Sequence, residues 1–157
     1  MPASSRSEPG PPKPAARSAL ELVGKRVSWH GVRVGRIEEV LLDGDHAQVI
    51  GFVLRCEDGL DRFLPISACK LGDTVELGAP LAISEPRALH YYRSRAVPLE
   101  RLLRGSAGER SGRDVAPIRD VRLGEAGLVT ELVVADDRVR SIPAARARVA
   151  LPPPAER

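Results

Sequence analysis

The acidic turn Asp43-Gly44-Asp45 is the first group of side chains in this sequence that could do chemistry. Carboxylates spaced around a glycine occur in calcium-binding loops, where oxygen ligands surround the cation. Such a loop needs several more oxygen ligands at fixed spacing and ends in a bidentate Glu, and none of these follows here. We therefore interpret the segment as a hairpin turn between two strands.

The three histidines and two cysteines are the next candidates for metal binding or nucleophilic catalysis. His30, His46 and His90 are far apart, and the sequence has neither a His pair at i, i+4 nor a Cys-x-x-Cys motif. Cys56 and Cys69 have no activating neighbour in the sequence, so we expect free, partly buried thiols. A glycine-rich phosphate loop and a nucleophile elbow are also absent. We expect no catalytic residue, no metal, no cofactor and no enzymatic activity.

The segment between residues 85 and 113 is the most basic part of the chain, with seven Arg against three Glu. It also contains two adjacent tyrosines, and Arg beside aromatic rings can bind phosphate backbones and stack on bases. Tyr and Arg are equally the favoured anchors of protein interfaces. In a third interpretation, the tyrosines pack on the fold and the arginines stay in water. The candidate partner-binding residues are Arg87, Tyr91, Tyr92, Arg93, Arg95, Arg101 and Arg104.

Short β-strands must position these side chains, because strand-like runs dominate the rest of the sequence. Apolar runs recur every eight to twelve residues or so with turn residues between them, which is typical of a small barrel or sandwich. Residues 48–55 have apolar side chains on both faces, which predicts a central strand. Aromatic residues make up only 3% of the chain, so the core must consist mainly of Val, Leu, Ile and Ala.

The second half of the chain repeats the first half. The matching segments are 34–42 with 115–123, 49–54 with 129–134, and 63–68 with 141–146. Three strand-like segments recur in the same order with nearly constant spacing. This pattern predicts a tandem repeat.

The first repeat resembles the PRC-barrel family. The resemblance rests on Leu22-Val23-Gly24-Lys25-Arg26-Val27, on Gly31, on residues 34–42 and 49–54, and on Phe63-Leu64-Pro65. The family includes the cytoplasmic part of the photosynthetic reaction-centre H subunit and the C-terminal part of the ribosome maturation factor RimM. The resemblance implies a small β-barrel that docks onto a larger partner, and it implies no catalysis. It covers about residues 20–84, whereas the second repeat lacks a counterpart of the opening strand.

The repeat and the composition together predict the organisation of the chain. We expect an all-β fold of tandem small PRC-type β-barrels, with a shortened second copy and a short helical linker that includes a helix after Pro98. Pro-rich composition predicts disordered tails at both ends. The expected segments are a tail at 1–19, the first repeat at 20–84, a basic linker at 85–109, the second repeat at 110–151 and a tail at 152–157.

Three functional hypotheses follow from this organisation. The first is a non-catalytic adaptor that docks on a protein complex, membrane complexes included. The second is an RNA- or ribosome-associated processing factor. The third is a homo-oligomer that exchanges strands through an unpaired edge near residues 129–134. No apolar run approaches the roughly 20 residues that span a bilayer, and no secretory signal pattern is visible, so we expect a cytoplasmic protein.

The exposure of the linker side chains distinguishes these hypotheses. A continuous basic face with an exposed Tyr91 or Tyr92 favours nucleic acid. Joint exposure of the linker leucines favours a protein partner. These leucines are Leu89, Leu99, Leu102 and Leu103.

Overall fold

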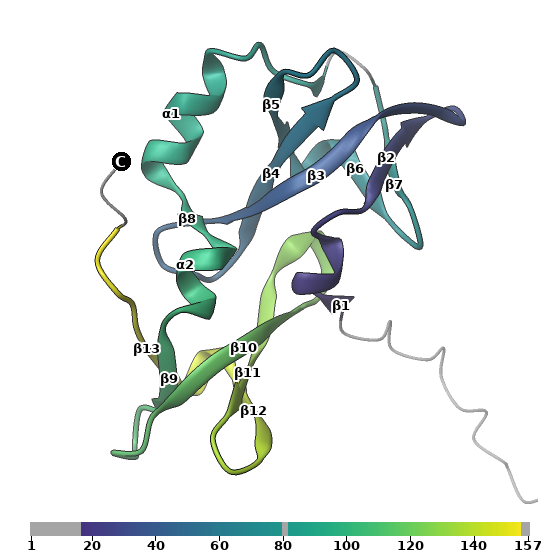
Figure 1. The fold of residues 1–157 in the computed structure, drawn as a ribbon. Coiled ribbons are helices and arrows are strands. Elements are labelled where there is room, and N and C mark those ends of the chain that lie inside the picture. Colours follow the sequence, from purple (N-terminus) through teal and green to yellow (C-terminus); the bar gives the residue numbers. More distant parts are fainter. Residues whose placement is uncertain (1–16, 80–81, 155–157) are drawn as a thin grey trace, which may run out of the picture.

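The computed structural model describes residues 17–79 and 82–154. This part of the chain forms two curled β-sheets, one above the other in Figure 1, each bent into a half-barrel. Two short helices, α1 (Ala88–Arg95) and α2 (Leu99–Leu103), connect them along the chain. The structure therefore confirms the all-β fold with a short helical linker, including the helix expected after Pro98.

The first sheet has seven strands, in the order β5-β4-β3-β2-β7-β6, and β8 pairs with β3. β7 runs parallel to its neighbour β2, and the other described strand pairs of this sheet are antiparallel. β4 lies between β3 and β5, which confirms the central strand predicted for residues 48–55. The strands are β2 (Arg26–Trp29), β3 (Val32–Leu42), β4 (Val49–Cys56), β5 (Asp61–Pro65), β6 (Cys69–Leu71), β7 (Val75–Leu77) and β8 (Val97–Pro98).

The second sheet has six strands, in the order β12-β11-β10-β9-β13, and β1 pairs with β10. Among the described residues it has no counterpart of β7, so the second copy is the shorter one, as expected. Its strands are β1 (Arg17–Ser18), β9 (Ser106–Glu109), β10 (Ala116–Leu123), β11 (Val129–Ala135), β12 (Val139–Pro143) and β13 (Ala147–Ala150). The 3₁₀ turns with described bounds are η1 (Leu20–Leu22), η2 (Ile66–Ala68), η4 (Glu125–Gly127) and η5 (Ala144–Arg146).

The two sheets match even in the positions of their register shifts. The β3–β4 ladder has register shifts at Ile37/Glu39 and Leu41/Leu42. The β10–β11 ladder has them at Ile118/Asp120 and Arg122/Leu123, which are the matching positions of the sequence repeat. Because a bulge bends a strand at a defined point, the repeated sequence specifies the same curvature twice.

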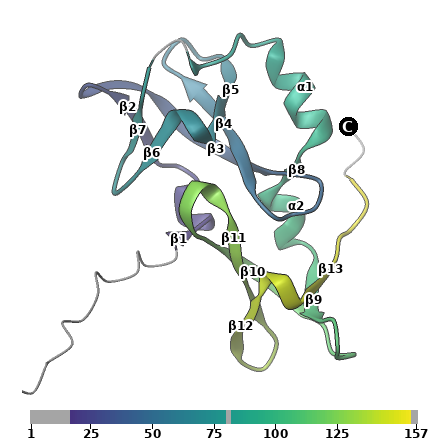
Figure 2. The same cartoon turned by 180° about the vertical axis from the view of Figure 1, so that it is seen from behind.

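The first strand of each copy, β1 or β8, pairs with the sheet of the other copy. Arg17 of β1 pairs with Leu123 of β10, and Val97 of β8 pairs with Leu42 of β3. Leu42 and Leu123 occupy matching positions, so the exchange is reciprocal. Figures 1 and 2 show β1 beside the lower sheet and β8 beside the upper one. The two copies are therefore interlocked rather than merely adjacent.

The second copy consequently begins at Val97, earlier than the repeat boundary at 110 that the sequence indicated. The second copy starts with the same three elements as the first: β8 matches β1, α2 matches η1 and β9 matches β2. Strand β9 also lies beside β10, just as β2 lies beside β3. The strand was missed because Ser106-Ala107-Gly108-Glu109 has no β-branched or aromatic side chain. It forms a strand because β10 and β13 pair with its two edges.

A pseudo-two-fold axis relates the copies. Gln48 and Leu128 form an isolated antiparallel bridge, in which the N–H of Val129 donates to Ala47 O at 2.9 Å. The two residues precede the matching valines Val49 and Val129. An antiparallel bridge is itself locally two-fold symmetric, so the axis passes between the hairpin turns of the two copies.

One hydrophobic core serves both copies. It contains ten pairs of matching side chains, one of each pair from each copy, and every one is less than 9% exposed. The pairs are Ala19/Leu99, Leu22/Leu102, Val27/Ala107, Ile37/Ile118, Val40/Val121, Leu42/Leu123, Val49/Val129, Phe52/Leu132, Leu54/Val134 and Leu64/Ile142. Because this core spans both sheets, we expect the copies to unfold together.

The ends of the chain were expected to be disordered tails. Residues 1–16 and 155–157 lie outside the described residues, whereas Arg17 and Ser18 form β1 and so do not belong to a tail. The O atom of Pro152 accepts a hydrogen bond from Arg101 Nε at 2.9 Å, which holds the start of the C-terminal segment against α2. No helix of the described residues has the length and apolar character needed to cross a membrane.

Candidate functional site

Helix α1 is fixed on the outer face of the first sheet by its apolar side. Leu89 is buried there against Leu41, Val53 and Phe63 in a second, smaller apolar cluster. The ring of Tyr92 stacks on Phe63, with centroids 3.8 Å apart and an angle of 12° between the planes. Among the described residues no such cluster lies on the second sheet, so within this part of the chain α1 is a feature of the first copy alone.

A partly buried ion pair also holds α1 in place. Arg93 Nη2 lies 3.0 Å from Glu39 Oε2, and only 30% and 21% of the two side chains is exposed. Glu39 follows the bulge in β3, and its carboxylate faces the helix. Arg93 and Tyr92, both candidate partner-binding residues, therefore anchor the helix to the sheet.

The opposite side of α1 presents Tyr91 and Arg95 to solvent. Tyr91 is 54% exposed, and the Arg95 guanidinium lies 3.8 Å from the centre of its ring. Arg95 Nη1 also donates to Tyr91 O at 3.1 Å, which orients the guanidinium over the ring. Arg87 stands just before the helix, almost fully exposed, with Glu85 at 3.8 Å. We call Arg87, Tyr91 and Arg95 the α1 face.

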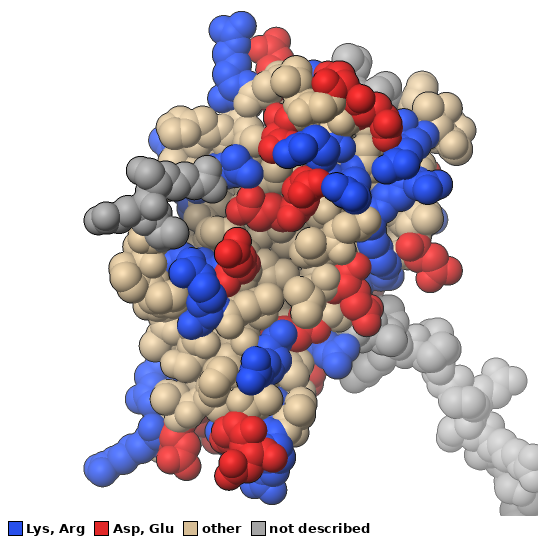
Figure 3. All heavy atoms as spheres, viewed as in Figure 1, with Lys and Arg blue, Asp and Glu red and all other residues tan. Residues whose placement is uncertain are grey.

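The remaining two candidate residues lie beyond β8, Arg101 on α2 and Arg104 directly after its last residue. Arg101 is engaged by the C-terminal segment through Pro152, and Arg104 is exposed at the end of the helix. The structure thus brings together three of the seven candidates on the α1 face and uses three others for internal contacts. The arginines do not form one continuous basic surface, and Figure 3 shows acidic and basic side chains interspersed over the face it displays.

Two other features that the sequence analysis considered as binding surfaces, the linker leucines and the edge of β11, are not exposed. Leu89, Leu99 and Leu102 are buried and Leu103 is half-buried, so the linker has no apolar surface made of leucines. Strand β11 is paired with β10 on one side and β12 on the other. The edge near residues 129–134 is therefore occupied and is not available for strand exchange.

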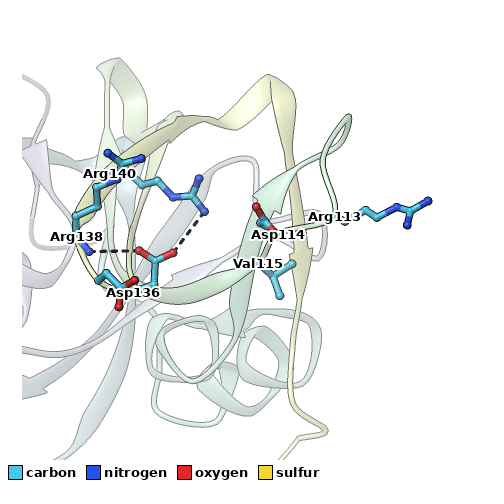
Figure 4. Close-up of a pocket in the computed structure, with 7 residues that line it drawn as sticks. Arg113, Asp114, Val115, Asp136, Arg138 and Arg140 are labelled. Atoms are coloured by element: carbon cyan, nitrogen blue, oxygen red, sulfur yellow. Dashed lines mark hydrogen bonds and ion pairs between the residues drawn. The ribbon is translucent and has the colours of Figure 1, made fainter.

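The far end of the second sheet holds a polar pocket of about 620 Å³, shown in Figure 4. Arg140 and the backbone N–H of Arg138 both point at the Asp136 carboxylate, at 3.8 and 3.3 Å. That backbone hydrogen bond, with help from Arg140, lowers the pKa of Asp136. In the first copy Arg62 pairs with Asp58 in the same place, at 2.8 Å. Because the pair recurs, we assign it the role of closing the hairpin.

The residues considered for metal or thiol chemistry have structural roles. Asp43 Oδ1 accepts the N–H of Ala47 at 2.8 Å within the β3–β4 turn, which confirms the hairpin turn. Cys56 and Cys69 are free and half-buried, as expected, and burial raises the pKa of Cys69 to about 12. Within residues 17–79 and 82–154, no group of three or more His, Cys, Asp or Glu side chains is arranged to hold a metal ion.

A groove beside the pseudo-two-fold axis was not foreseen from the sequence. It has a volume of about 570 Å³ and lies between the β3–β4 turn of the first copy and η5 and β13 of the second. His46 stands at its edge, and burial lowers the pKa of this residue, with Asp43 opposing the shift and Arg101 adding to it. We call this the second-copy groove. Only the pairing of the two copies brings its walls together, so no single sequence motif marks it.

Two regions of the described surface combine exposed side chains in a way that suits recognition, the α1 face and the second-copy groove. Neither contains an arrangement of nucleophile, base and orienting group of the kind that catalysis requires. Models of known protein families and the sequences of curated proteins were compared with this chain, and neither comparison found a match.

Proposed function

We propose that this protein is a non-catalytic adaptor of the PRC-barrel type that docks on a larger protein complex through the α1 face. The observation that carries the proposal is the exposed, pre-oriented pair of Tyr91 and Arg95, with the guanidinium 3.8 Å from the ring centre. Tyr and Arg are the residue types that most often dominate the binding energy of protein interfaces. The duplicated half-barrels serve as the scaffold that holds this face.

The rigidity of the helix supports this proposal. Ordering flexible side chains on binding costs roughly 0.5–1.5 kcal/mol for each one immobilised. Here Leu89, Tyr92 and Arg93 fix α1 on the sheet before any partner arrives. Arg95 is already stacked on the Tyr91 ring in the free protein, so the fold avoids much of the entropy cost of ordering these side chains on binding. Two arginines on this face favour a partner surface that carries carboxylates.

The state of the arginines favours a protein over RNA as the partner. Binding to a nucleic-acid backbone rests on several cations that are free to contact phosphates. Arg93 is instead paired with Glu39, and Arg101 is bound to Pro152. What remains on the α1 face is one tyrosine with two arginines, too few cations to follow a phosphate backbone, and this set suits a protein contact.

The proposal is tested by affinity capture from the native host with the full chain, with and without nuclease. The wild type is compared with Tyr91→Ala and with Val139→Ala, a matched control at a 72% exposed apolar residue of the second sheet. We expect one partner complex to survive nuclease treatment and to be lost with Tyr91→Ala only. An interface hot spot is worth about 2 kcal/mol or more, or about 30-fold in Kd.

Two results would contradict the proposal. Loss of the captured partner after nuclease treatment would assign the protein to the RNA-associated class. Equal capture by Tyr91→Ala and Val139→Ala would show that the α1 face does not bind the partner.

A further inference from the structure

The duplication gives the molecule two matching grooves, one on each side of the pseudo-two-fold axis. Each groove lies between the hairpin turn of one copy and the 3₁₀ turn and following strand of the other. The first-copy groove, beside Ile66 and Cys69, has a volume of about 330 Å³. The second-copy groove has about 570 Å³. The two copies can therefore be compared position by position, each serving as the reference for the other.

Smaller side chains at two matching positions contribute to the larger volume of the second-copy groove. Ile66 reaches the opposite turn in the first copy, since a Cβ built on Gly127 would lie 2.3 Å from Ile66 Cδ1. Ala144 holds the matching position in the second copy, and Ala147 replaces Cys69. The two side chains that fill the first-copy groove, Ile66 and Cys69, are thus both alanine in the second-copy groove, which leaves the second-copy groove open.

The open groove combines an apolar floor with a basic rim. Val129 and Leu132 form the floor, and Leu128 stands beside them with 53% of its surface exposed. Arg110 and Arg148 line the rim from the second copy. Arg110 is fixed there, because its Nε donates to the backbone O of Ala147 at 3.3 Å. Among the described lining residues Asp45 is the single carboxylate, so the rim carries an excess of positive charge.

Strand β13 forms one wall of the groove and is an edge strand. It pairs with β9 on one side, and within the described residues no strand pairs with its other side. An extended peptide can add to such an edge through main-chain hydrogen bonds, while its side chains enter neighbouring pockets. The groove thus offers apolar contact, positive charge and a strand edge together.

We propose that the second-copy groove binds an extended segment of a partner protein that carries an aliphatic side chain flanked by carboxylates. The aliphatic side chain fills the space left by Ala144, and the carboxylates meet Arg110 and Arg148. This site is separate from the α1 face, so it adds a second contact to the proposed adaptor and does not depend on the first.

Charge and shape select this occupant over the alternatives. The chain's own N-terminal segment carries Arg6 and Lys13 against Glu8, so its charge has the same sign as that of the rim. Single-stranded nucleic acid is bound by stacking its bases on aromatic rings. The described lining of the groove contains no Phe, Tyr or Trp. An acidic, aliphatic peptide complements both the floor and the rim.

The test uses the full chain and a fluorescein-labelled synthetic decapeptide with a central Leu-Val-Leu flanked by Glu residues. Binding is measured by fluorescence anisotropy and mapped by ¹H–¹⁵N NMR. We expect shifts at Leu128, Leu132 and residues 144–149, and no binding of the peptide in which Lys replaces Glu. Refilling the groove with Ala144→Ile, the residue type of the first copy, should weaken binding at least about tenfold, the equivalent of 1.4 kcal/mol.

Two further variants separate the proposal from a folding defect. Leu128→Asp changes an exposed side chain without repacking the core and should weaken binding similarly, through repulsion of the peptide carboxylates. Arg148→Glu should do the same, whereas Lys70→Glu, at the matching position of the plugged groove, should have no effect. Tyr91→Ala should leave peptide binding unchanged, so this test and the test of the α1 face fail independently.

Several outcomes would overturn the proposal. These are peptide binding unaffected by Ala144→Ile, equal binding of the Lys peptide, or binding of a dT12 oligonucleotide at the groove. Groove resonances that shift with protein concentration alone would assign the surface to a second copy of this chain, and would also overturn it.

Discussion

A truncation in the second copy should destabilise the first copy equally, because the two share one core. We choose Leu102→Ala on α2, where the leucine is fully buried (0% exposed) among side chains from both copies. The substitution removes three carbon atoms, or about 2.4 kcal/mol at about 0.8 kcal/mol for each buried group. The cavity left behind adds to this, and fully buried Leu→Ala changes cost about 2–5 kcal/mol. We expect a loss of about 3 kcal/mol.

Urea unfolding measures this loss with two probes. Trp29 is the only tryptophan and lies in β2 of the first sheet, so its fluorescence reports on the first copy. Far-UV circular dichroism reports on both sheets. For a slope of about 2 kcal/mol/M, the midpoint should fall by about 1.5 M. The fall should be the same by both probes, although the substitution lies in the second copy.

A separation of the two probes would refute this reasoning. If Leu102→Ala lowered the midpoint of the circular dichroism but left that of Trp29 unchanged, the copies would be independent domains and the exchanged strands would contribute little. Val139→Ala serves as the control, since this 72% exposed residue should shift neither midpoint. Leu22→Ala, the matching substitution in the first copy, should reproduce the effect of Leu102→Ala within about 1 kcal/mol.

The remaining predictions concern α1 and a buried thiol. Tyr92→Ala removes the stack on Phe63, so amide hydrogen exchange in α1 should accelerate about tenfold while the β3–β4 ladder keeps its protection; unchanged exchange would show that the stack does not hold the helix. Cys69 should resist Ellman's reagent at pH 8 until the chain unfolds, because burial raises its pKa to about 12 from an ordinary value of 9.0. This raised pKa contributes stability that is fully present below about pH 9 and is lost as the pH rises toward 12, so Cys69→Ala should flatten the alkaline side of the stability profile.

The leading strand of each copy is held on the sheet of the other copy, so the two copies depend on each other for a complete fold. β1 is locked onto the second copy by the N–H of Leu20, which donates to Asp120 Oδ1 at 3.1 Å, and by the Ser18 hydroxyl, which donates to the same carboxylate. β8 joins the first copy directly before α2. Neither copy keeps a complete core without the other, because each contributes half of the buried side chains.

The α1 face and the second-copy groove differ in how far the sequence could predict them. The Tyr/Arg composition of residues 85–113 did identify Tyr91 and Arg95. The composition could not distinguish these two residues from Tyr92 and Arg93, which point toward the sheet. Neighbouring residues of a helix point in different directions, so adjacent Tyr and Arg residues of α1 lie on opposite sides of it. The groove has no local signature, since its walls come from turns about 80–100 residues apart.

The sequence by itself determined the strand content, the repeated hairpins and the central strand at residues 48–55. These follow from local alternation and from self-similarity, which are properties of neighbouring residues and of the spacing between them. The tertiary structure decided where the second copy begins, which strands are exchanged and which side chains stay exposed. Ser106-Ala107-Gly108-Glu109 has no strand propensity of its own and becomes β9 only because β10 and β13 pair with it. Long-range pairing and shared burial are energies between distant segments, and no local pattern encodes them.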